Sequence, residues 1–288
     1  MTSMRGPRPV REAPASRVTS ITVHRPSAPL ADLVELFWAA DSYVAQAPRE
    51  RVLPSGAQSL VIHLDERPLR IYAGEDATDA TDVPGAILCG ARQAPLVIDT
   101  ALGPTVGVEF KPGGARPFFD LPADALTGQV VSLDALWGTS ARALRERLME
   151  TPSPLARAQL LEALLLRRLD RSFELGAALR LSLEAFEHRE LTSVAEVNRR
   201  TGLSPKRLLA LFREEIGLSP KAFWRIRRFR AALRDLDHGA LRGAALAAEH
   251  GYFDQAHFVR EFRSLAGSTP REYLSARVVG SDHVSVLR

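Results

Sequence analysis

Short apolar runs separated by turn residues fill the part of the chain between Val52 and Phe110. The runs have the length of strands and lie at 59–64, 69–72, 86–89, 96–98 and 105–110. The segments between them contain Pro and Gly, which mark turns. Several strands at such close spacing favour an antiparallel sheet or a small barrel. The segment 32–40 fits a short helix and a strand equally well, so periodicity does not decide between them.

Helical spacing replaces this pattern after Thr127. Apolar residues recur three and four positions apart over 141–148, prolines then interrupt the pattern, and a wide leucine stripe follows over 155–169. A third helix is predicted over 175–187. Such a stripe is typical of packing inside a domain, and a dimer contact is the alternative.

Helix boundaries are clearly marked after this third helix. Ser193 and Glu196 have the spacing of a capping box, in which each side chain bonds the other residue's backbone N–H. Gly202 supplies a left-handed residue that turns the chain, and Ser204 with Pro205 begins a new helix. The apolar face of that helix consists of Leu208, Leu211, Phe212 and Ile216. A short helix, a glycine turn and a second amphipathic helix form the outline of a helix-turn-helix unit.

The same signals occur a second time. At a displacement of 50 residues, Gly217, Ser219, Pro220 and Phe223 correspond to Gly267, Thr269, Pro270 and Tyr273. Gly202 and Gly251 are 49 residues apart instead, so the second unit has one extra residue in its turn. Thr269 and Glu272 have the spacing of another capping box. Two copies with matching caps and turns indicate two helix-turn-helix units far more specifically than one copy would.

A single helix over 220–236 is predicted to connect the two units. At ~1.5 Å per residue it spans roughly 25 Å, which can hold the units about one turn of DNA apart, ~34 Å between successive major grooves. Because each unit alone binds weakly, a rigid connector would make the second contact effectively intramolecular.

Charge is distributed unevenly along the chain. The formal net charge is +4, but 191–277 contains 16 Lys and Arg against 9 Asp and Glu, a net of +7, so the remainder carries about −3. A basic module beside a mildly acidic one indicates a polyanionic partner for the basic module. The lone Cys89 excludes an intrachain disulfide and is typical of a reducing cytoplasm. No run has the length of a membrane span, and the first twenty residues lack the apolar stretch of a secretory signal, which predicts a disordered leader.

A long motif runs through both units. It consists of 202–208, Phe212, 217–220 and 228–229, followed by 251–258, Arg260, 262–263, Gly267 and 269–273. With these residues, the stretch 193–274 resembles the DNA-binding domain of the AraC/XylS family of bacterial transcription regulators. The resemblance implies a seven-helix, all-α domain that reads two successive major grooves of double-stranded DNA, with RNA polymerase as a further partner.

A looser likeness extends upstream. Val52 to Gly56 before a strand, and 107–114, resemble the sensor half of one AraC-like subgroup, which implies a β-rich, partly cupin-like fold.

Together these features predict an α+β chain of five parts. These are a disordered leader (1–20), a β-rich sensor domain (21–130), a helical connector (131–190), an AraC-type DNA-binding domain (191–277) and a flexible tail (278–288). Such a chain would be a cytoplasmic transcription regulator, controlled by a small-molecule effector or by assembly, for example as a homodimer. The residues specify neither the effector, nor the operator, nor activation against repression.

In the first recognition helix, the outward positions proposed to contact DNA are Lys206, Arg207, Ala210 and Arg213. Lys206 and Arg207 are expected at guanine or phosphate, and Arg213 at phosphate. The family often has an arginine that reaches a base where Ala210 stands, whereas Ala210 can contact only a thymine methyl. Asn198 also departs from the family, which has a small residue there, and is expected to bond nearby backbone.

The second unit keeps more of the family pattern. Gln255 can pair bidentately with adenine, and Arg260 with guanine. Arg263 and Arg271 are expected to hold phosphates, with a solvated helix face as the alternative for such arginines. His257 either contacts DNA or packs beside its neighbour in the sequence. The second unit should therefore carry more of the sequence reading.

The alternative from another class is an enzyme on the β-rich half with an accessory DNA-binding module, and a pure interaction scaffold is a third. Cys89 lies in a strand-like run without a Cys-His-Asn arrangement and is expected to be a small core residue. His63, Glu109 and His24 are too few for a cupin-type metal centre, and His63 alternates with Val61 as a packed residue. No catalytic residue, metal or cofactor is therefore expected.

Overall fold

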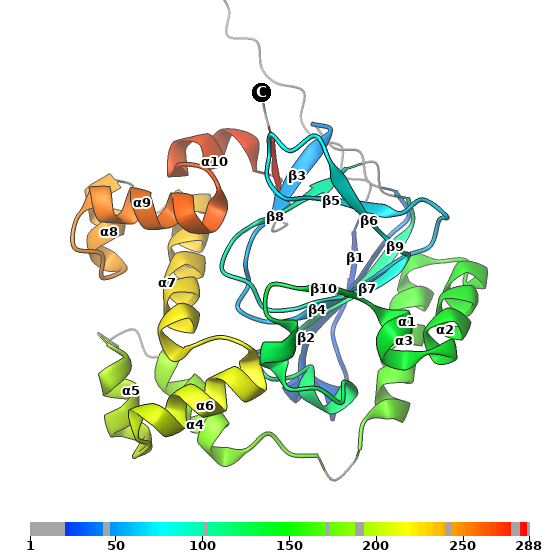
Figure 1. The fold of residues 1–288 in the computed structure, drawn as a ribbon, viewed down its shortest axis with the longest axis horizontal. Coiled ribbons are helices and arrows are strands. Elements are labelled where there is room, and N and C mark those ends of the chain that lie inside the picture. Colours follow the sequence, from blue (N-terminus) through cyan, green and yellow to red (C-terminus); the bar gives the residue numbers. More distant parts are fainter. Residues whose placement is uncertain are drawn as a thin grey trace, which may run out of the picture.

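The computed structural model describes residues 21–42, 47–100, 103–170, 173–187, 193–239, 243–277 and 283–286. A β-rich half lies beside a helical half (Figure 1). Leu53 and Ala91 of the β-rich half are buried in the same core as the C-terminal helices, so the two halves share one packed boundary. The leader predicted for 1–20 lies outside the described residues.

Six antiparallel strands form the larger sheet, in the order β1-β2-β9-β4-β7-β10. Their bounds are β1 Thr22–His24, β2 Val34–Ala40, β9 Thr105–Phe110, β4 Ser59–His63, β7 Ala86–Cys89 and β10 Val130–Ser132. The segment that periodicity left undecided is thus strand β2, which pairs with β9 from Val34↔Phe110 to Ala40↔Thr105. Because β2 buries residues on both of its faces, its sequence does not alternate regularly between apolar and polar residues. Its pairing with β9 shows that the segment is a strand.

Five antiparallel strands form the second sheet, in the order β11-β3-β8-β5-β6. Their bounds are β11 His283–Ser285, β3 Arg49–Val52, β8 Leu96–Asp99, β5 Leu69–Tyr72 and β6 Ala80–Val83. Ile87 and Cys89 of the larger sheet pack with Leu69, Val83 and Ile98 of the smaller one. The two sheets therefore enclose a common apolar layer, and the predicted β-rich N-terminal domain is confirmed.

Three helices cover the β-rich half: α1 (Leu133–Trp137), α2 (Thr139–Glu150) and α3 (Pro154–Arg168). Short 3-10 turns complete it at η1 (Leu30–Asp32), η2 (Arg116–Phe118) and η3 (Ala123–Leu126). The leucine stripe of α3 packs inward, since Leu161 and Leu165 are fully buried in one core with Phe37 and Val108. This confirms packing inside the domain for these stripe residues.

Seven described helices make up the C-terminal half: α4 (Ala177–Glu187), α5 (Val194–Thr201), α6 (Pro205–Ile216), α7 (Pro220–Asp237), α8 (Gly243–Glu249), α9 (Gln255–Ala266) and α10 (Pro270–Ala276). Helix α4 belongs to this half by packing, because Phe186 contacts Phe212 and Phe223 at ring distances of 5.3 and 5.4 Å. The boundary expected at residue 191 therefore falls after a helix that is already part of the C-terminal core. No helix within the described ranges combines the length and apolar character needed to cross a bilayer.

Most of the predicted helix signals are present. The side chains of Ser204, Ser219, Asp254 and Thr269 each accept a backbone N–H at the start of a helix. The capping box of Thr269 and Glu272 is complete. The one predicted at Ser193 is wrong, because Ser193 makes no cap bond and Glu196 pairs with Arg199 and Arg200 instead.

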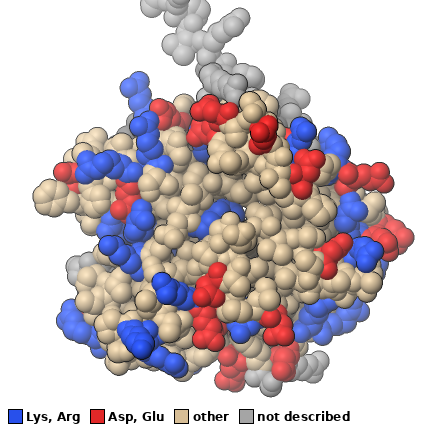
Figure 2. Space-filling model, in the orientation of Figure 1, with Lys and Arg blue, Asp and Glu red and all other residues tan. Residues whose placement is uncertain are grey.

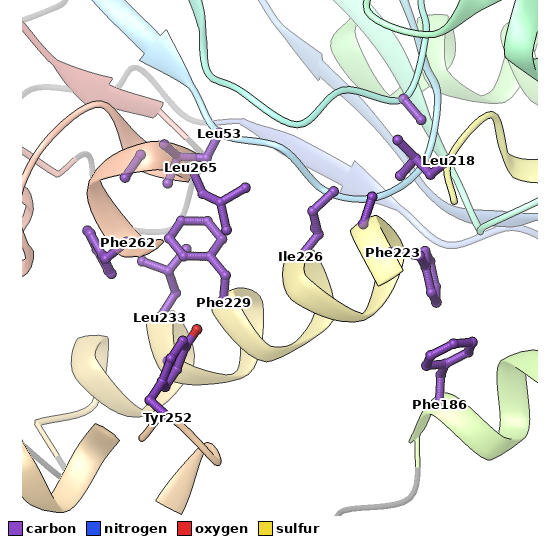
Figure 3. Packing of buried hydrophobic residues seen from close by; sticks show 14 of the residues in the cluster. Leu53, Phe186, Leu218, Phe223, Ile226, Phe229, Leu233, Tyr252, Phe262 and Leu265 are labelled. Carbon is purple, nitrogen blue, oxygen red and sulfur yellow. The ribbon is translucent and has the colours of Figure 1, made fainter. Parts of the chain in front are cut away.

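Helix α7 connects the two units and packs against both of them (Figure 1). Near its start, Phe223 packs edge-on against Phe212 of α6 at 5.5 Å, and further along, Phe229 packs against Phe262 of α9 at 5.2 Å. Figure 3 shows Phe223, Ile226 and Phe229 leaving α7 toward the surrounding core. One rigid helix thus fixes both recognition helices.

Candidate nucleic-acid interface

Helix α6 presents one buried face and one exposed face. Leu208, Phe212 and Ile216 are buried against the core, which turns the opposite side outward. The four predicted contact residues, Lys206, Arg207, Ala210 and Arg213, are all exposed. The first recognition helix therefore offers two cations near its N-terminus, one methyl group in the middle and a third cation further on.

Asn198 lies at the turn between α5 and α6. Its side-chain nitrogen donates to the carbonyl oxygen of Leu203 at 2.9 Å, which satisfies a backbone group that the turn leaves free. The expected local backbone partner is confirmed, and Asn198 braces the turn between α5 and α6.

Helix α9 has the same two-faced design. Phe258, Phe262 and Leu265 are buried, whereas Gln255, Arg260 and Arg263 are exposed. The Arg263 guanidinium lies 3.9 Å from Glu272, and both side chains are about 60 % exposed; such a pair is weakly held. All three side chains can therefore reach a partner along the outer face of α9.

His257 differs from its neighbours because the protein already uses its ring. Its Nδ1 accepts the backbone N–H of Phe253 at 3.3 Å, and its Nε2 lies 3.4 Å from Glu261. The ring also packs edge-on against Tyr252 at 5.5 Å. Both nitrogens and one ring edge are thus engaged in holding the turn before α9.

A second polar cluster fastens α9 to α7. The Arg228 guanidinium lies over the Tyr252 ring at 4.1 Å, over Trp224 at 4.8 Å, and 3.7 Å from Glu261. Burial raises the pKa of Tyr252 to about 12, so this phenol is neutral at physiological pH. Sequence reasoning assigned no role to Glu261, because Arg228 and Glu261 are on different helices and no regular spacing joins them.

Basic side chains predominate over the helical half in the view of Figure 2. Lys and Arg gather along its left side, whereas Asp and Glu lie mainly over the β-rich half. This distribution agrees with the net charge of +7 for 191–277 and favours a polyanion at the helical half.

The β-rich half contacts both units at equivalent positions. Gly217 and Gly267, the residues that end α6 and α9, both have positive φ. A Cβ on Gly217 would lie 2.6 Å from the carbonyl oxygen of Ala123, and the Thr127 hydroxyl donates to the Gly217 carbonyl. A Cβ on Gly267 would lie 3.0 Å from Cδ of Arg51. Only glycine combines this backbone conformation with so close an approach.

The C-terminal strand adds a third contact. Strand β11 pairs with β3, and Val284 is fully buried in the core of the helical half. The His283 ring lies 2.8 Å from the buried carboxylate of Glu50. This corrects the flexible tail expected for 278–288 where the structure describes it, over 283–286. Three residues were too short a run to predict as a strand without their partner.

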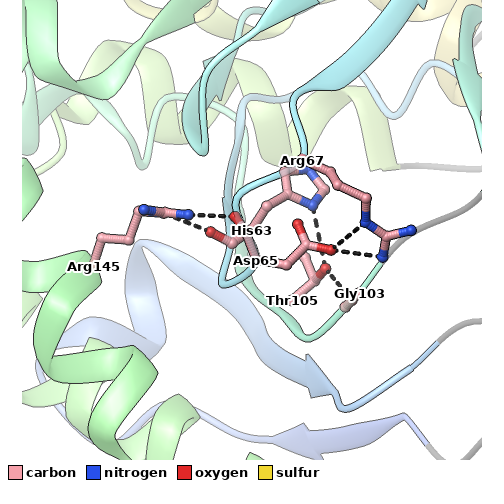
Figure 4. Close-up of polar contacts among 6 residues, drawn as sticks. All are labelled: His63, Asp65, Arg67, Gly103, Thr105 and Arg145. Atoms are coloured by element: carbon pink, nitrogen blue, oxygen red, sulfur yellow. Dashed lines mark hydrogen bonds and ion pairs between the residues drawn. The ribbon is translucent and has the colours of Figure 1, made fainter.

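The residues weighed for catalysis are enclosed in the β-rich half. Burial raises the pKa of the Cys89 thiol and lowers that of His63 to about 4, so both are uncharged at neutral pH. His63 Nδ1 lies 3.3 Å from the Thr105 hydroxyl, while Arg145 donates to the His63 carbonyl at 2.8 Å (Figure 4). Across the described ranges, no three His, Cys, Asp or Glu side chains gather in a way that could hold a metal ion.

Comparison with known families gives two matches. Residues 197–276 match a helix-turn-helix domain, and residues 22–132 match a domain of unknown function (DUF6597). No curated protein matches the sequence.

Solved structures give further similarities. ToxT from Vibrio cholerae is 10 % identical, with a TM-score of 0.48 over 83 % of this chain and 97 % of that one. Unsaturated fatty acid-bound ToxT from V. cholerae strain SCE256 is 10 % identical, with a TM-score of 0.45 over 92 % and 97 %. A probable AraC family transcriptional regulator from Rhodopseudomonas palustris CGA009 is 25 % identical, with a TM-score of 0.30 over 33 % and 92 %.

The family match over 197–276 falls on the two units that the geometry defines. Each unit has a capped recognition helix with a buried aromatic face and an exposed polar face, and both are fixed to α7. Residues 197–276 of this chain therefore form a helix-turn-helix domain with two units attached to one connecting helix.

Proposed function

We propose that the chain regulates transcription by binding a specific site on double-stranded DNA, with α6 and α9 in two successive major grooves. The observation that carries this proposal is the attachment of both recognition helices to α7, with their polar faces exposed. A rigid connection makes binding of the second unit effectively intramolecular once the first is bound.

The two units would contribute unequally. In the second, Gln255 would pair with adenine and Arg260 with guanine O6 and N7, while Arg263 would hold a phosphate. His257 would position the turn, since its ring is engaged with Phe253 and Glu261.

The first unit would mainly anchor the protein. Lys206 and Arg207 would hold phosphate or guanine, Arg213 would hold phosphate, and Ala210 can touch only a thymine methyl. Most of the sequence preference would therefore come from the second unit.

The β-rich half would control DNA binding by the two units. Because it contacts both units at Gly217 and Gly267, a small-molecule effector, or assembly into a homodimer, could shift the placement of both recognition helices together. Such control requires a difference in affinity between two states. RNA polymerase would be the further partner, in the cytoplasm.

We infer that the activity is binding rather than catalysis. Support comes from Cys89 and His63, the two side chains suited to nucleophilic or general-base chemistry that the sequence singles out in the β-rich half, which are both at most 5 % exposed. A substrate would have no access to either group.

Selection of bound duplexes from a random DNA pool tests the proposal. The expected product is a two-part site whose halves lie about one helical turn apart, with the stronger preference in one half. Recovery of no preferred sequence, or of a single short half-site, would contradict it.

A further inference from the structure

The second unit has one residue more than the first in its turn, and the structure identifies this residue as Phe253. Tyr252 follows Gly251 as Leu203 follows Gly202, and the next matching residues are the helix caps Ser204 and Asp254. Phe253 stands between Tyr252 and Asp254 without a counterpart in the first unit.

The Phe253 side chain is 92 % exposed. Among the residues that the structure describes, the other exposed large apolar side chains belong to residues between 37 and 56 % exposed, and the adjacent Tyr252 is 4 % exposed. Leaving an aromatic ring in water forgoes the stabilisation that burial would give. Because the ring is almost entirely outside the core, it contributes little to folding.

The backbone that carries this ring is fixed. The N–H of Phe253 donates to His257 Nδ1 at 3.3 Å, and the Asp254 side chain accepts the N–H of His257 at 2.6 Å. The His257 ring is itself held by Tyr252 and Glu261. The Phe253 side chain therefore extends into solvent from a turn whose backbone is held by hydrogen bonds.

The turn also lies at the end of α9 that helix-turn-helix proteins direct to base edges, because the N-terminal residues of a recognition helix contact the bases. Gln255 and Ala256, the first two residues of α9, are exposed beside it. The apolar feature of base edges in the major groove is the C5-methyl group of thymine.

From these observations we infer that Phe253 is a specificity-determining residue of the second unit, whose ring contacts the C5-methyl of a thymine at the edge of that half-site. The inference rests on the proposed function, because it requires α9 to lie in a major groove. It assigns the apolar part of the reading to the inserted residue, beside the polar readers Gln255 and Arg260.

Replacing thymine by deoxyuridine tests the contact, because this change removes only the methyl group. Each thymine of the selected duplex is replaced in turn, and affinity is measured for the full-length wild type, Phe253→Ala and the control Leu155→Ala. Leu155 is also an exposed apolar residue, 45 % exposed, on α3 in the β-rich half.

For the wild type and Leu155→Ala, replacing one particular thymine of the second half-site should lower the affinity for the duplex about fourfold, the effect expected for one buried methyl group. Phe253→Ala should bind the unmodified duplex at least that much more weakly and be insensitive to deoxyuridine at the same position. Phe253→Leu should retain part of the sensitivity.

Equal deoxyuridine sensitivity of the wild type and Phe253→Ala at every thymine would overturn the inference, as would a selected half-site without a preferred thymine. In both cases the proteins still bind specific DNA, so the proposed function stands. Failure of the wild type to bind any duplex specifically would instead overturn the proposed function.

Discussion

Arg260 and Arg263 lie three positions apart on the exposed side of α9, yet we expect them to act on different parts of DNA. Arg260 is nearer the middle of the helix, whereas Arg263 is in the last turn beside Glu272. A contact with a base adds sequence preference, and a contact with phosphate adds affinity for any sequence.

Alanine substitution should separate these two roles. Arg260→Ala should cost about 1–3 kcal/mol on the selected duplex and broaden the sequence preference, whereas Arg263→Ala should weaken binding to all duplexes alike and reduce the salt dependence. Titration of a selected and a scrambled duplex at several salt concentrations measures both effects. Equal losses from both variants on both duplexes would refute the assignment.

The sequence identified the exposed residues of both units, but it did not predict the contacts of His257 with Phe253 and Glu261. Outward positions follow from helical periodicity, which depends only on local spacing. The engagement of His257 depends on Glu261 and on the backbone of Phe253, and the two roles left open for it could be told apart only with those neighbours in place. Glu261 was missed for the same reason.

Local sequence signals predicted the helices well and the edge strands of the sheets poorly. Serine or threonine before proline marked the starts of α6, α7 and α10, each with a side-chain cap. Cap chemistry is contained within four residues, so a sequence can show it. Strand β11 depends instead on β3, more than two hundred residues away, and no local pattern reveals such a partner.

The two predicted capping boxes give a matched pair of substitutions. Thr269→Ala removes a formed cap from α10 and should lower the free energy of unfolding by about 1 kcal/mol. Ser193→Ala removes a hydroxyl that makes no cap bond, so it should lower the free energy of unfolding by only a few tenths of a kcal/mol. Urea unfolding of both variants measures the difference. An equal loss in both would show that the cap at Thr269 contributes nothing specific.

The two halves of the molecule are joined through the ends of both recognition helices. Thr127 bonds the backbone at Gly217, Arg51 packs on Gly267, and Val284 of β11 enters the helical core. The first two contacts fall on equivalent residues of the repeat, because Gly217 and Gly267 end equivalent helices. The sequence predicted the repeat, but it did not predict that these two glycines contact the β-rich half.

Removal of the Thr127 hydroxyl tests the strength of this junction. Thr127→Val keeps the shape of the side chain but loses the bond to the Gly217 carbonyl, which should cost about 1 kcal/mol and speed amide exchange in the turn between α6 and α7. Thr151→Val is the control, because its hydroxyl bonds Arg147 within one exposed segment. Unchanged exchange and stability in Thr127→Val would mean that the contact does not hold the halves together.

Because α7 packs against both recognition helices, we expect it to hold them at a fixed separation on DNA. Insertion of five base pairs between the halves of the selected site probes this separation, because about half a helical turn moves one groove to the opposite face of the duplex. Affinity should then fall to that of a duplex with one half-site alone. Full affinity for the lengthened site would mean that α7 does not fix the separation of the two recognition helices.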